Sequence, residues 1–408
     1  MTAIVIFVLT YGLITARRLR WLPLGRPAAA MLGAVLMVVA GVLTPEASYA
    51  AVDHDTLVLL LGMMILSAYL IRAGVFRWVC ERAVRAAKTP LRLLLGLGWL
   101  AGVLSAFLVN DTVCLFLTPA VVEVCRRSKL PMGPYLLALA TSANLGSAAT
   151  LVGNPQNMLI GSMSGLGFAP FLASSGLAAL AGLAVNSALL WLYFRKDIGD
   201  HPLERPPAQE DALPHEGPPR WLVLAVCAGV VASFFAGAHL GYGALAGAAA
   251  LMVLSRRDPR EVLESVDWAL LLFFSGLFVV VAGLESTGLV ARGWATAAGH
   301  FKLDDPLGLT WFSGAVVAGS NLVSNVPMVL LVGPHLKALG SEALGWVLLA
   351  FVSTVAGNLT LVGSVANLIV AEGARKEHEL GFWEYFKFGA VSTVAALLVG
   401  VPLIVWTA

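Results

Sequence analysis

Charged residues are scarce in this chain, at 12% of its 408 residues, whereas soluble globular proteins have roughly 25%. Hydrophobic residues make up 59% of the sequence and form apolar stretches along almost its whole length. This composition excludes a water-soluble globular protein, and a formal net charge of +2 gives no sign of a nucleic-acid partner. We therefore predict an all-α, multi-pass protein of the cytoplasmic (inner) membrane that contacts lipid, since a spanning helix needs about 20 mostly apolar residues.

Cysteine and histidine are also few and carry no catalytic or metal-binding pattern. The four cysteines show no CxxC spacing, and the seven histidines are scattered, mostly near the ends of apolar segments. An enzyme embedded in the membrane would need a nucleophile–base pair or clustered metal ligands, so we expect neither enzymatic activity nor a resident cofactor. No Walker motif occurs, so any ATP would have to act through a separate ATPase subunit.

Arginine and lysine are distributed unevenly between the loops. The loop 16–27 is rich in arginine, whereas 45–55 contains acidic residues and no basic one. Because basic residues accumulate in cytoplasmic loops, we place the first loop inside and the second outside. The segment 195–220 starts with Arg195 and Lys196 and continues with several prolines among acidic residues, which is typical of a flexible cytoplasmic linker.

Two halves of the chain resemble each other. The motif TLVGNPQNMLI at 150–160 matches TLVGSVANLIV at 360–370. Upstream, FLVNDT at 107–112 matches NLVSNV at 321–326. The segment that follows the first long span of each half is rich in basic residues only in the first half, as expected if the halves cross the membrane in opposite senses. An inverted-topology repeat of this kind is typical of secondary transporters.

The repeat predicts an organisation with about ten transmembrane helices. Its parts are N-terminal scaffold helices at 1–54, repeat 1 at 55–194, the linker at 195–220, helices preceding repeat 2 at 221–266, and repeat 2 at 267–408. Each repeat contains a re-entrant hairpin, at 91–125 and 307–340, and a broken helix, at 134–163 and 343–371.

The hairpin assignment rests on length and charge. Both ends of 91–125 are basic, so both are expected on the cytoplasmic side. The second arm, 113–125, would reach only about 20 Å at a rise of 1.5 Å per residue, which is short of the roughly 30 Å hydrocarbon core. Two short complete spans would fit the same charges.

Four places interrupt helix within the membrane, and each is rich in amide and hydroxyl groups: 109–112, 150–157, 323–326 and 357–365. These side chains could simply cap helix ends, because a backbone N–H without a partner is costly in hydrocarbon. Four breaks in symmetric pairs favour a binding cavity instead, since broken helices at membrane depth occur where they line one. No arginine or lysine falls at a break, so an anion there would be held by helix N-termini and amides alone.

Asp111 is the only ionisable residue at the four breaks, and the symmetric position holds Asn325. Asparagine caps a helix about as well as aspartate does, so capping does not explain the choice of an acid. An ionisable group at membrane depth is a functional candidate. We therefore predict that Asp111 binds the coupling cation or carries a proton itself.

The tips NDT and SN, each followed by a TxxGxxxN break, resemble the ion transporter superfamily, in its ArsB/NhaD permease branch. The resemblance covers roughly 55–163 and 267–371. It implies that tips and breaks surround the substrate and the coupling ion, at Asn110, Asp111, Thr112, Gly153, Asn154, Asn157, Ser324, Asn325, Gly363, Ser364 and Asn367. Asp111 in the first tip and Val326 in place of a threonine in the second depart from the dicarboxylate carriers of this superfamily.

These observations predict a secondary active transporter, driven by H⁺ or Na⁺, that moves a small inorganic solute or anion. Efflux of arsenite or antimonite is favoured, because a neutral trihydroxide suits a site of amides and hydroxyls. The alternatives are a sodium-coupled carboxylate or sulfate transporter, a sodium/proton antiporter and, from another class, a channel. A homodimer and a separate ATPase subunit are left open as partners.

Overall fold

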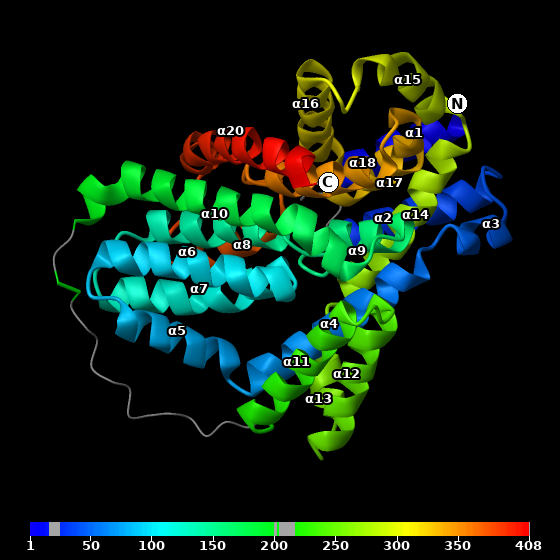
Figure 1. Ribbon diagram of the computed structural model, residues 1–408. Coiled ribbons are helices and arrows are strands. Elements are labelled where there is room, and N and C mark those ends of the chain that lie inside the picture. Colours follow the sequence, from blue (N-terminus) through cyan, green and yellow to red (C-terminus); the bar gives the residue numbers. More distant parts are fainter. Residues whose placement is uncertain (16–24, 200–201, 204–216, 408) are drawn as a thin grey trace.

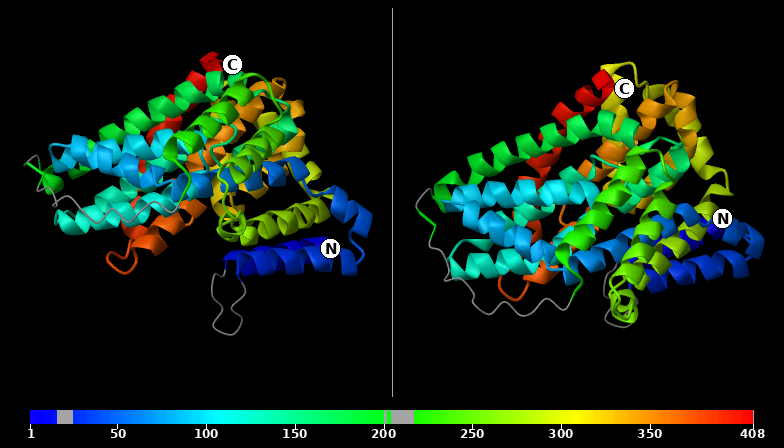
Figure 2. Two further views of the ribbon diagram at one scale, coloured as in Figure 1. Left: turned by 90° about the horizontal axis from the view of Figure 1, so that it is seen from below. Right: turned by 60° about the horizontal axis from the view of Figure 1, so that its bottom comes forward.

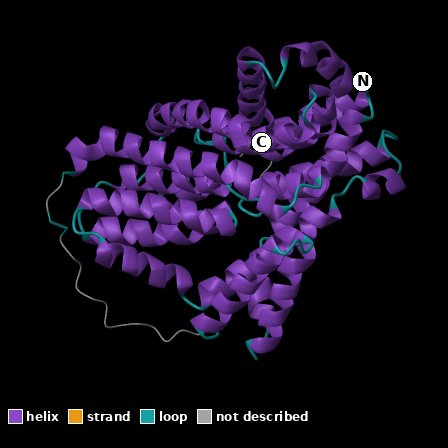
Figure 3. Cartoon of the chain, in the orientation of Figure 1, coloured by secondary structure: helices purple, strands orange, loops and turns teal. Residues whose placement is uncertain are grey.

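The computed structural model describes residues 1–15, 25–199, 202–203 and 217–407, and within these ranges it contains helices and loops but no strand (Figure 3). Five helices are long and apolar enough to cross a membrane: α4 (His54–Arg72), α6 (Pro90–Phe107), α10 (Phe168–Ile198), α14 (Trp268–Glu285) and α20 (Phe382–Thr407). The prediction of an all-α membrane protein is confirmed.

Most of the loop 16–27 and of the linker 195–220 lies outside the described residues. One boundary of the linker was predicted wrongly, because α10 continues through Arg195 and Lys196 and ends at Ile198. Basic residues in the last turn of a helix interact favourably with its C-terminal dipole, so these two extend α10 and do not end it.

The two halves repeat the same order of helices. Before the long helices α4 and α14, they contain α1 (Thr2–Thr15), α2 (Arg26–Val39) and α3 (Pro45–Ala50) in the first half, and α11 (Arg220–Phe235), α12 (Leu240–Leu254) and α13 (Arg260–Glu264) in the second. The helix α2 packs on α14, and α12 packs on α4. Each half therefore places its second helix against the long helix of the other half, and the two halves interlock (Figure 1).

Local signals at the starts of α4 and α14 show the repeat directly. The Asp53 carboxylate accepts a hydrogen bond from the N–H of Thr56 (2.7 Å), and the Asp267 carboxylate accepts one from the N–H of Leu270 (3.0 Å). Asp53 is thus the counterpart of Asp267, while Asp55 lies in the first turn of α4. Both long helices start at an acidic N-cap, which satisfies a backbone donor that has no partner within the helix.

A short connecting helix follows each long helix. These connectors are α5 (Val75–Ala86) and α15 (Leu289–Ala297). Gly74 and Gly288 precede them with φ of 68° and 65°, a left-handed conformation that glycine adopts without steric strain. The chain therefore turns sharply at the same point in each half.

The second hairpin turns at its predicted tip, and the first turns immediately before it, so that Asn110, Asp111 and Thr112 form the first turn of the helix that follows. In the first half, α6 and α7 (Asn110–Arg127) meet at residues 108–109; in the second, α16 (Pro306–Val323) and α17 (Asn325–Val332) meet at Ser324. The two broken helices are divided into α8 (Met132–Ser147) and α9 (Pro155–Ser164), and into α18 (Glu342–Ala356) and α19 (Val365–Ala374). The interruptions lie at 148–154 and 357–364, within or beside the predicted breaks.

The molecule has two bodies. The scaffold consists of α1, α2, α4 and α11–α14, while the hairpin domain consists of α6–α10 and α16–α20, in which α6 packs on α8, α7 on α19 and α10 on α20. In Figure 1, α6, α7, α8 and α10 lie as a stack of rods, with α4, α11 and α12 beside it, and Figure 2 shows the same separation from two other directions. The connectors α5 and α15 join the bodies, which leaves the hairpin tips at the junction between them.

Candidate functional site

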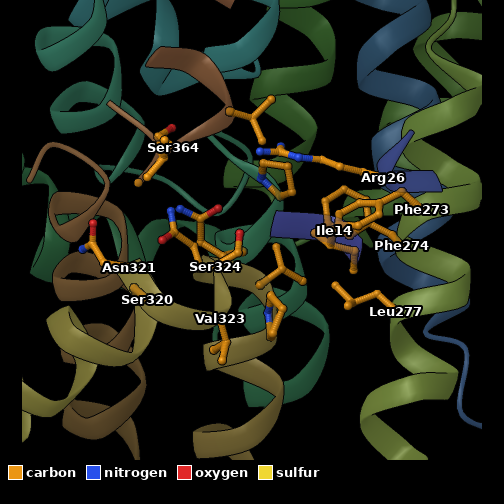
Figure 4. A pocket seen from close by; sticks show the side chains of 18 of the residues that line it. Ile14, Arg26, Phe273, Phe274, Leu277, Ser320, Asn321, Val323, Ser324 and Ser364 are labelled. Carbon is orange, nitrogen blue, oxygen red and sulfur yellow. The ribbon is translucent and has the colours of Figure 1, made fainter. Parts of the chain in front are cut away.

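Both hairpin tips and the second break meet around a cavity of about 160 Å³, here called the central cavity. The hairpin domain contributes Gly363 and the polar residues Asn110, Asp111, Gln156, Ser320, Asn321, Ser324, Asn325 and Ser364. The scaffold contributes Tyr11 and Arg26 together with apolar side chains of α1 and α14. Figure 4 shows Ser320, Ser324 and Ser364 on one side of this cavity and Phe273, Phe274 and Leu277 on the other.

A second cavity, of about 260 Å³, lies on another side of the first tip and is here called the lateral cavity. Its polar lining residues are Ser67, Arg72, Asp111, Thr112, Ser265 and Asp267. Asp111, Leu270 and Val365 line both cavities. Asp111 therefore belongs to the wall between them.

Helix capping explains only one of the four breaks. The side chain of Asn154 accepts a hydrogen bond from the N–H of Asn157 (2.9 Å) and caps α9. Val109 precedes α7, and neither Ser324 before α17 nor Ser364 before α19 makes a capping hydrogen bond with its side chain. At the first tip, Oδ1 of Asn110 accepts a hydrogen bond from the N–H of Asp111 (2.9 Å), whereas Ser324 and Ser364 in the second half are available for other contacts.

Two predicted site residues, Asn157 and Asn367, lie behind the site. The amide of Asn157 donates to the backbone carbonyls of Ser147 (3.3 Å) and Thr150 (2.9 Å). The amide of Asn367 donates in the same way to the carbonyls of Gly357 (2.7 Å) and Thr360 (3.1 Å), and both asparagines are fully buried. In each half the asparagine satisfies carbonyls ten and seven positions earlier, which lie in or next to the unwound backbone.

Gly153 and Asn154 also support the first tip from behind. The carbonyl of Gly153 accepts a hydrogen bond from the N–H of Asn110 (2.9 Å), and the Asn154 amide donates to the hydroxyl of Ser147 (2.9 Å). Neither Gly153 nor Asn154 lines the central or the lateral cavity. Thr112 lines only the lateral cavity.

Asn144 on α8, which was not among the predicted site residues, joins the first tip to the second break. Its Oδ1 accepts hydrogen bonds from Asn110 Nδ2 (2.9 Å) and Ser364 Oγ (3.1 Å). Its Nδ2 donates to Oδ1 of Asn358 (2.9 Å) and of Asn367 (3.0 Å). The side chain is almost completely buried, so this network holds the polar wall of the central cavity in place.

Thr354 on α18 has the mirrored role at the first break. Its hydroxyl accepts hydrogen bonds from the amides of Asn154 (3.2 Å) and Gln156 (3.1 Å). In the alignment of 150–160 with 360–370, Thr354 is the counterpart of Asn144. Each repeat therefore uses one polar residue on α8 or α18 to hold the break of the other repeat, and extending the repeat alignment upstream would have identified both.

Several buried polar atoms that line the cavities have no hydrogen-bond partner in the described part of the chain. They are Tyr11 Oη, Ser320 Oγ and Asn325 Oδ1 in the central cavity, and Ser67 Oγ in the lateral cavity. A buried polar group without a partner costs about 1–3 kcal/mol. Four such atoms in two cavities indicate places where a polar ligand or water completes the hydrogen bonding.

Charged side chains lie near Asp111 that the sequence analysis did not predict. The prediction that only dipoles and amides face the site is wrong, because Arg26 at the start of α2 lines the central cavity and interacts electrostatically with Asp111. Asp267 at the start of α14 is the next charge that acts on Asp111. Figure 4 shows the Arg26 side chain reaching from the scaffold side into the cavity.

Comparisons with known proteins agree with this architecture. Residues 6–356 match the family model described as citrate transporter. The silicon efflux transporter LSI3 of Oryza sativa subsp. japonica is 34% identical over 94% of this chain and 93% of its own length. A Dictyostelium discoideum protein named arsB is 31% identical over 94% of this chain and 88% of its own, and the inner membrane protein YbiR of Escherichia coli is 30% identical over 88% and 90%.

Among solved structures, the YdaH transporter of Alcanivorax borkumensis shares the fold, with a TM-score of 0.53 and 14% identity over 99% of this chain and 96% of that one. The predicted multi-pass membrane location and the predicted family resemblance are confirmed, and the coarse function is that of a membrane transporter. The chain belongs to the citrate transporter family, within the ArsB-like branch of the ion transporter superfamily.

Proposed function

We propose that this protein is an ion-coupled permease that exports a small, polar, inorganic solute of the arsenite or antimonite type through the central cavity. The observation that carries the proposal is the set of three buried polar atoms, Tyr11 Oη, Ser320 Oγ and Asn325 Oδ1, that surround one cavity and have no partner among the described residues. Two hydroxyls can donate or accept and the amide oxygen accepts. A solute with several hydroxyl groups satisfies all three.

The size of the central cavity supports a small solute. A volume of about 160 Å³ is smaller than the roughly 300–1,000 Å³ of pockets that bind drug-sized molecules. The names of two relatives, arsB and a silicon efflux transporter, support a small inorganic solute. Arg26 and Asp111 bring one charge of each sign to this cavity, which suits a solute without net charge.

The arrangement of the two bodies supports transport by alternating access. Tyr11 and Arg26 belong to the scaffold, whereas Ser320, Asn325 and Ser364 belong to the hairpin domain. A displacement of one body against the other would carry the tips with their solute and change the side from which the cavity is reached. Asp111, at the first tip, would bind H⁺ or Na⁺ and couple this displacement to the ion gradient.

A carboxylate or sulfate transporter is the second candidate. The guanidinium of Arg26 in the central cavity favours it, because guanidinium groups bind planar or tetrahedral oxyanions through several donors. The description of the matching family as citrate transporter supports the same alternative.

Flux into proteoliposomes distinguishes these functions. We expect saturable, gradient-driven transport of arsenite or antimonite, and little transport of citrate or sulfate. Ser320→Ala should raise KM about fivefold, the equivalent of one hydrogen bond of about 1 kcal/mol. The control is Ser313→Ala on the same helix, whose buried hydroxyl also has no partner but lies outside both cavities; its KM should equal that of the parent. Flux that never saturates would indicate a channel, and citrate or sulfate as the preferred solute would favour the second candidate.

A further inference from the structure

We infer that the lateral cavity is a separate binding site and entry path for the coupling monovalent cation, which reaches Asp111 without passing through the central cavity. This inference rests on the proposed function, since it assigns to Asp111 the coupling ion of that transport cycle. What it adds is a second set of residues, chiefly Ser67 and Asp267, that bind the ion and do not contact the solute.

Geometry separates the two routes. Asp111 lines both cavities, and the only other residues that the two linings share are Leu270 and Val365. Both are apolar, so they form a wall that a hydrated ion does not cross easily. The carboxyl group of Asp111 can then meet the solute from one side and the cation from the other.

Charge distinguishes the two cavities. In the central cavity, Arg26 balances Asp111. In the lateral cavity, Asp111 and Asp267 are both acidic, and the single basic residue of the lining, Arg72, is held in an ion pair with Glu261. The lateral cavity therefore has a net negative lining, which attracts a cation. The other titratable neighbour of Asp111 is the buried thiol of Cys114, one turn further along α7.

Ser67 supplies an independent indication of a ligand. Its side chain is 1% exposed, and its hydroxyl has no hydrogen-bond partner among the described residues. Hydroxyl and carboxylate oxygens are ligands that hard cations and protonated water prefer. When α4 and α14 are aligned at their N-caps, Asp53 and Asp267, the counterpart of Ser67 is Val281. Packing of the repeated helix thus does not require a hydroxyl here, whereas an ion site does.

Two matched serines test the inference. Ser67 and Ser320 each have a buried hydroxyl that finds no partner in the described ranges of the chain, and each lines one of the two cavities. Ser67→Ala should raise the Na⁺ concentration for half-maximal flux about fivefold, or move the midpoint of proton-driven flux about 0.7 pH unit lower, with the solute KM at saturating ion unchanged. Ser320→Ala should raise the solute KM and leave the ion midpoint unchanged.

Asp267→Asn provides a second variant with an intact fold, because asparagine caps a helix about as well as aspartate. It removes one negative charge from the lateral cavity and should shift the ion midpoint in the same direction as Ser67→Ala. Asp111→Asn should abolish the ion dependence. Thermal stabilisation of purified protein by Na⁺, or by lower pH without Na⁺, measures ion binding without any solute. It should be reduced in Ser67→Ala and Asp267→Asn and absent in Asp111→Asn, and it identifies which of the two ions binds.

The outcomes separate this inference from the proposed function. If ions drive flux in the parent but Ser67→Ala and Asp267→Asn both keep the parent's ion midpoint, the lateral path is wrong while the transport proposal stands. If Ser67→Ala changes solute KM and ion midpoint equally, the two cavities act as one site and the inference also fails. If neither Na⁺ nor pH affects flux or stability, the ion-coupled function itself is wrong.

Discussion

At the scale of single residues, the polar side chains at the tips and breaks of this transporter divide into two groups. Some hold the unwound backbone, as Asn157 and Asn367 do, and others line the central cavity, as Asn325 and Ser364 do. Asn157 and Asn367 each donate to two carbonyls that have no helical partner. Ser364 differs, because it makes one hydrogen bond to Asn144 and lines the central cavity. The residues that the family resemblance groups together as one site thus divide into supporting and lining residues.

This division predicts different effects of substitution. Asn157→Ala leaves the carbonyl of Thr150 without a donor, and Asn367→Ala leaves that of Gly357 without one, at about 1–3 kcal/mol each. The second carbonyl of each pair keeps another donor, since Ser147 O still accepts from Asn154 Nδ2 and Thr360 O from the N–H of Gly363. Both variants should therefore lower the thermal unfolding midpoint by several degrees. Ser364→Ala should unfold close to the parent and instead raise the solute KM. Fluorescence-detected melting in detergent, paired with flux, measures both effects. Asn157→Ala and Asn367→Ala proteins with parental melting and weakened solute binding would show that these asparagines are ligands after all.

At the scale of helices, close crossings depend on glycine. A methyl group at position 146 of α8 would overlap the backbone of Gly102 on α6, and one at Gly276 on α14 would overlap that of Ala30 on α2. Small residues at membrane helix crossings allow the backbones to approach closely and gain van der Waals contact. The α6–α8 crossing carries the first tip and the first break, so its geometry positions half of the site.

Gly146→Ala should therefore separate α6 from α8, lower the unfolding midpoint and reduce transport together. The matched control is Gly96→Ala on α6, where a methyl group meets no atom within 4 Å. Alanine has the higher helix propensity, by up to about 1 kcal/mol, so the control should be as stable as the parent or slightly more stable. A Gly146→Ala protein with normal melting would mean that the crossing can widen without loss.

At the scale of the whole molecule, the scaffold and the hairpin domain are joined at the end assigned to the outer side. The hydroxyl of Ser162 on α9 donates to the carboxylate of Asp53, the N-cap of α4, at 2.8 Å. The central cavity is lined at the opposite end by Ile14 and Arg26, which flank the arginine-rich loop. With the loop 16–27 placed on the cytoplasmic side by its arginines, we predict that this conformation is closed on the outside and reached from the cytoplasm.

Ser162→Ala removes this bond between the bodies and keeps the Asp53 cap. One hydrogen bond of about 0.5–1.5 kcal/mol should shift the balance between inward and outward states by roughly twofold to tenfold. Val362, which lines the central cavity and is 49% exposed, provides the reporter position. In a background without the native cysteines, Val362→Cys should react faster from the cytoplasmic side, and Ser162→Ala should raise its labelling from outside. Equal labelling with and without Ser162→Ala would mean that the bond does not control access.

The sequence by itself determined the membrane class, the repeat of two halves, the positions of the hairpin tips and breaks, and the family, while the opposite orientation of the halves stays a prediction. Apolar length, the placement of arginine and the recurrence of a motif are patterns along the chain, and they do not depend on how the helices pack. They also identified Asp111, because an acid within an apolar run stands out without any knowledge of its neighbours.

Only the tertiary structure decided what surrounds Asp111. Tyr11 and Arg26 reach the central cavity from helices far away in sequence, and Asn144 contacts Asn358 across 214 positions. Such neighbours follow from how the two halves interlock, with each second helix on the long helix of the other half, and local pattern does not encode that pairing. For the same reason the sequence did not distinguish between the four polar breaks. The packing does distinguish them, because some of their side chains bind the unwound backbone while Asp111 lies between two cavities.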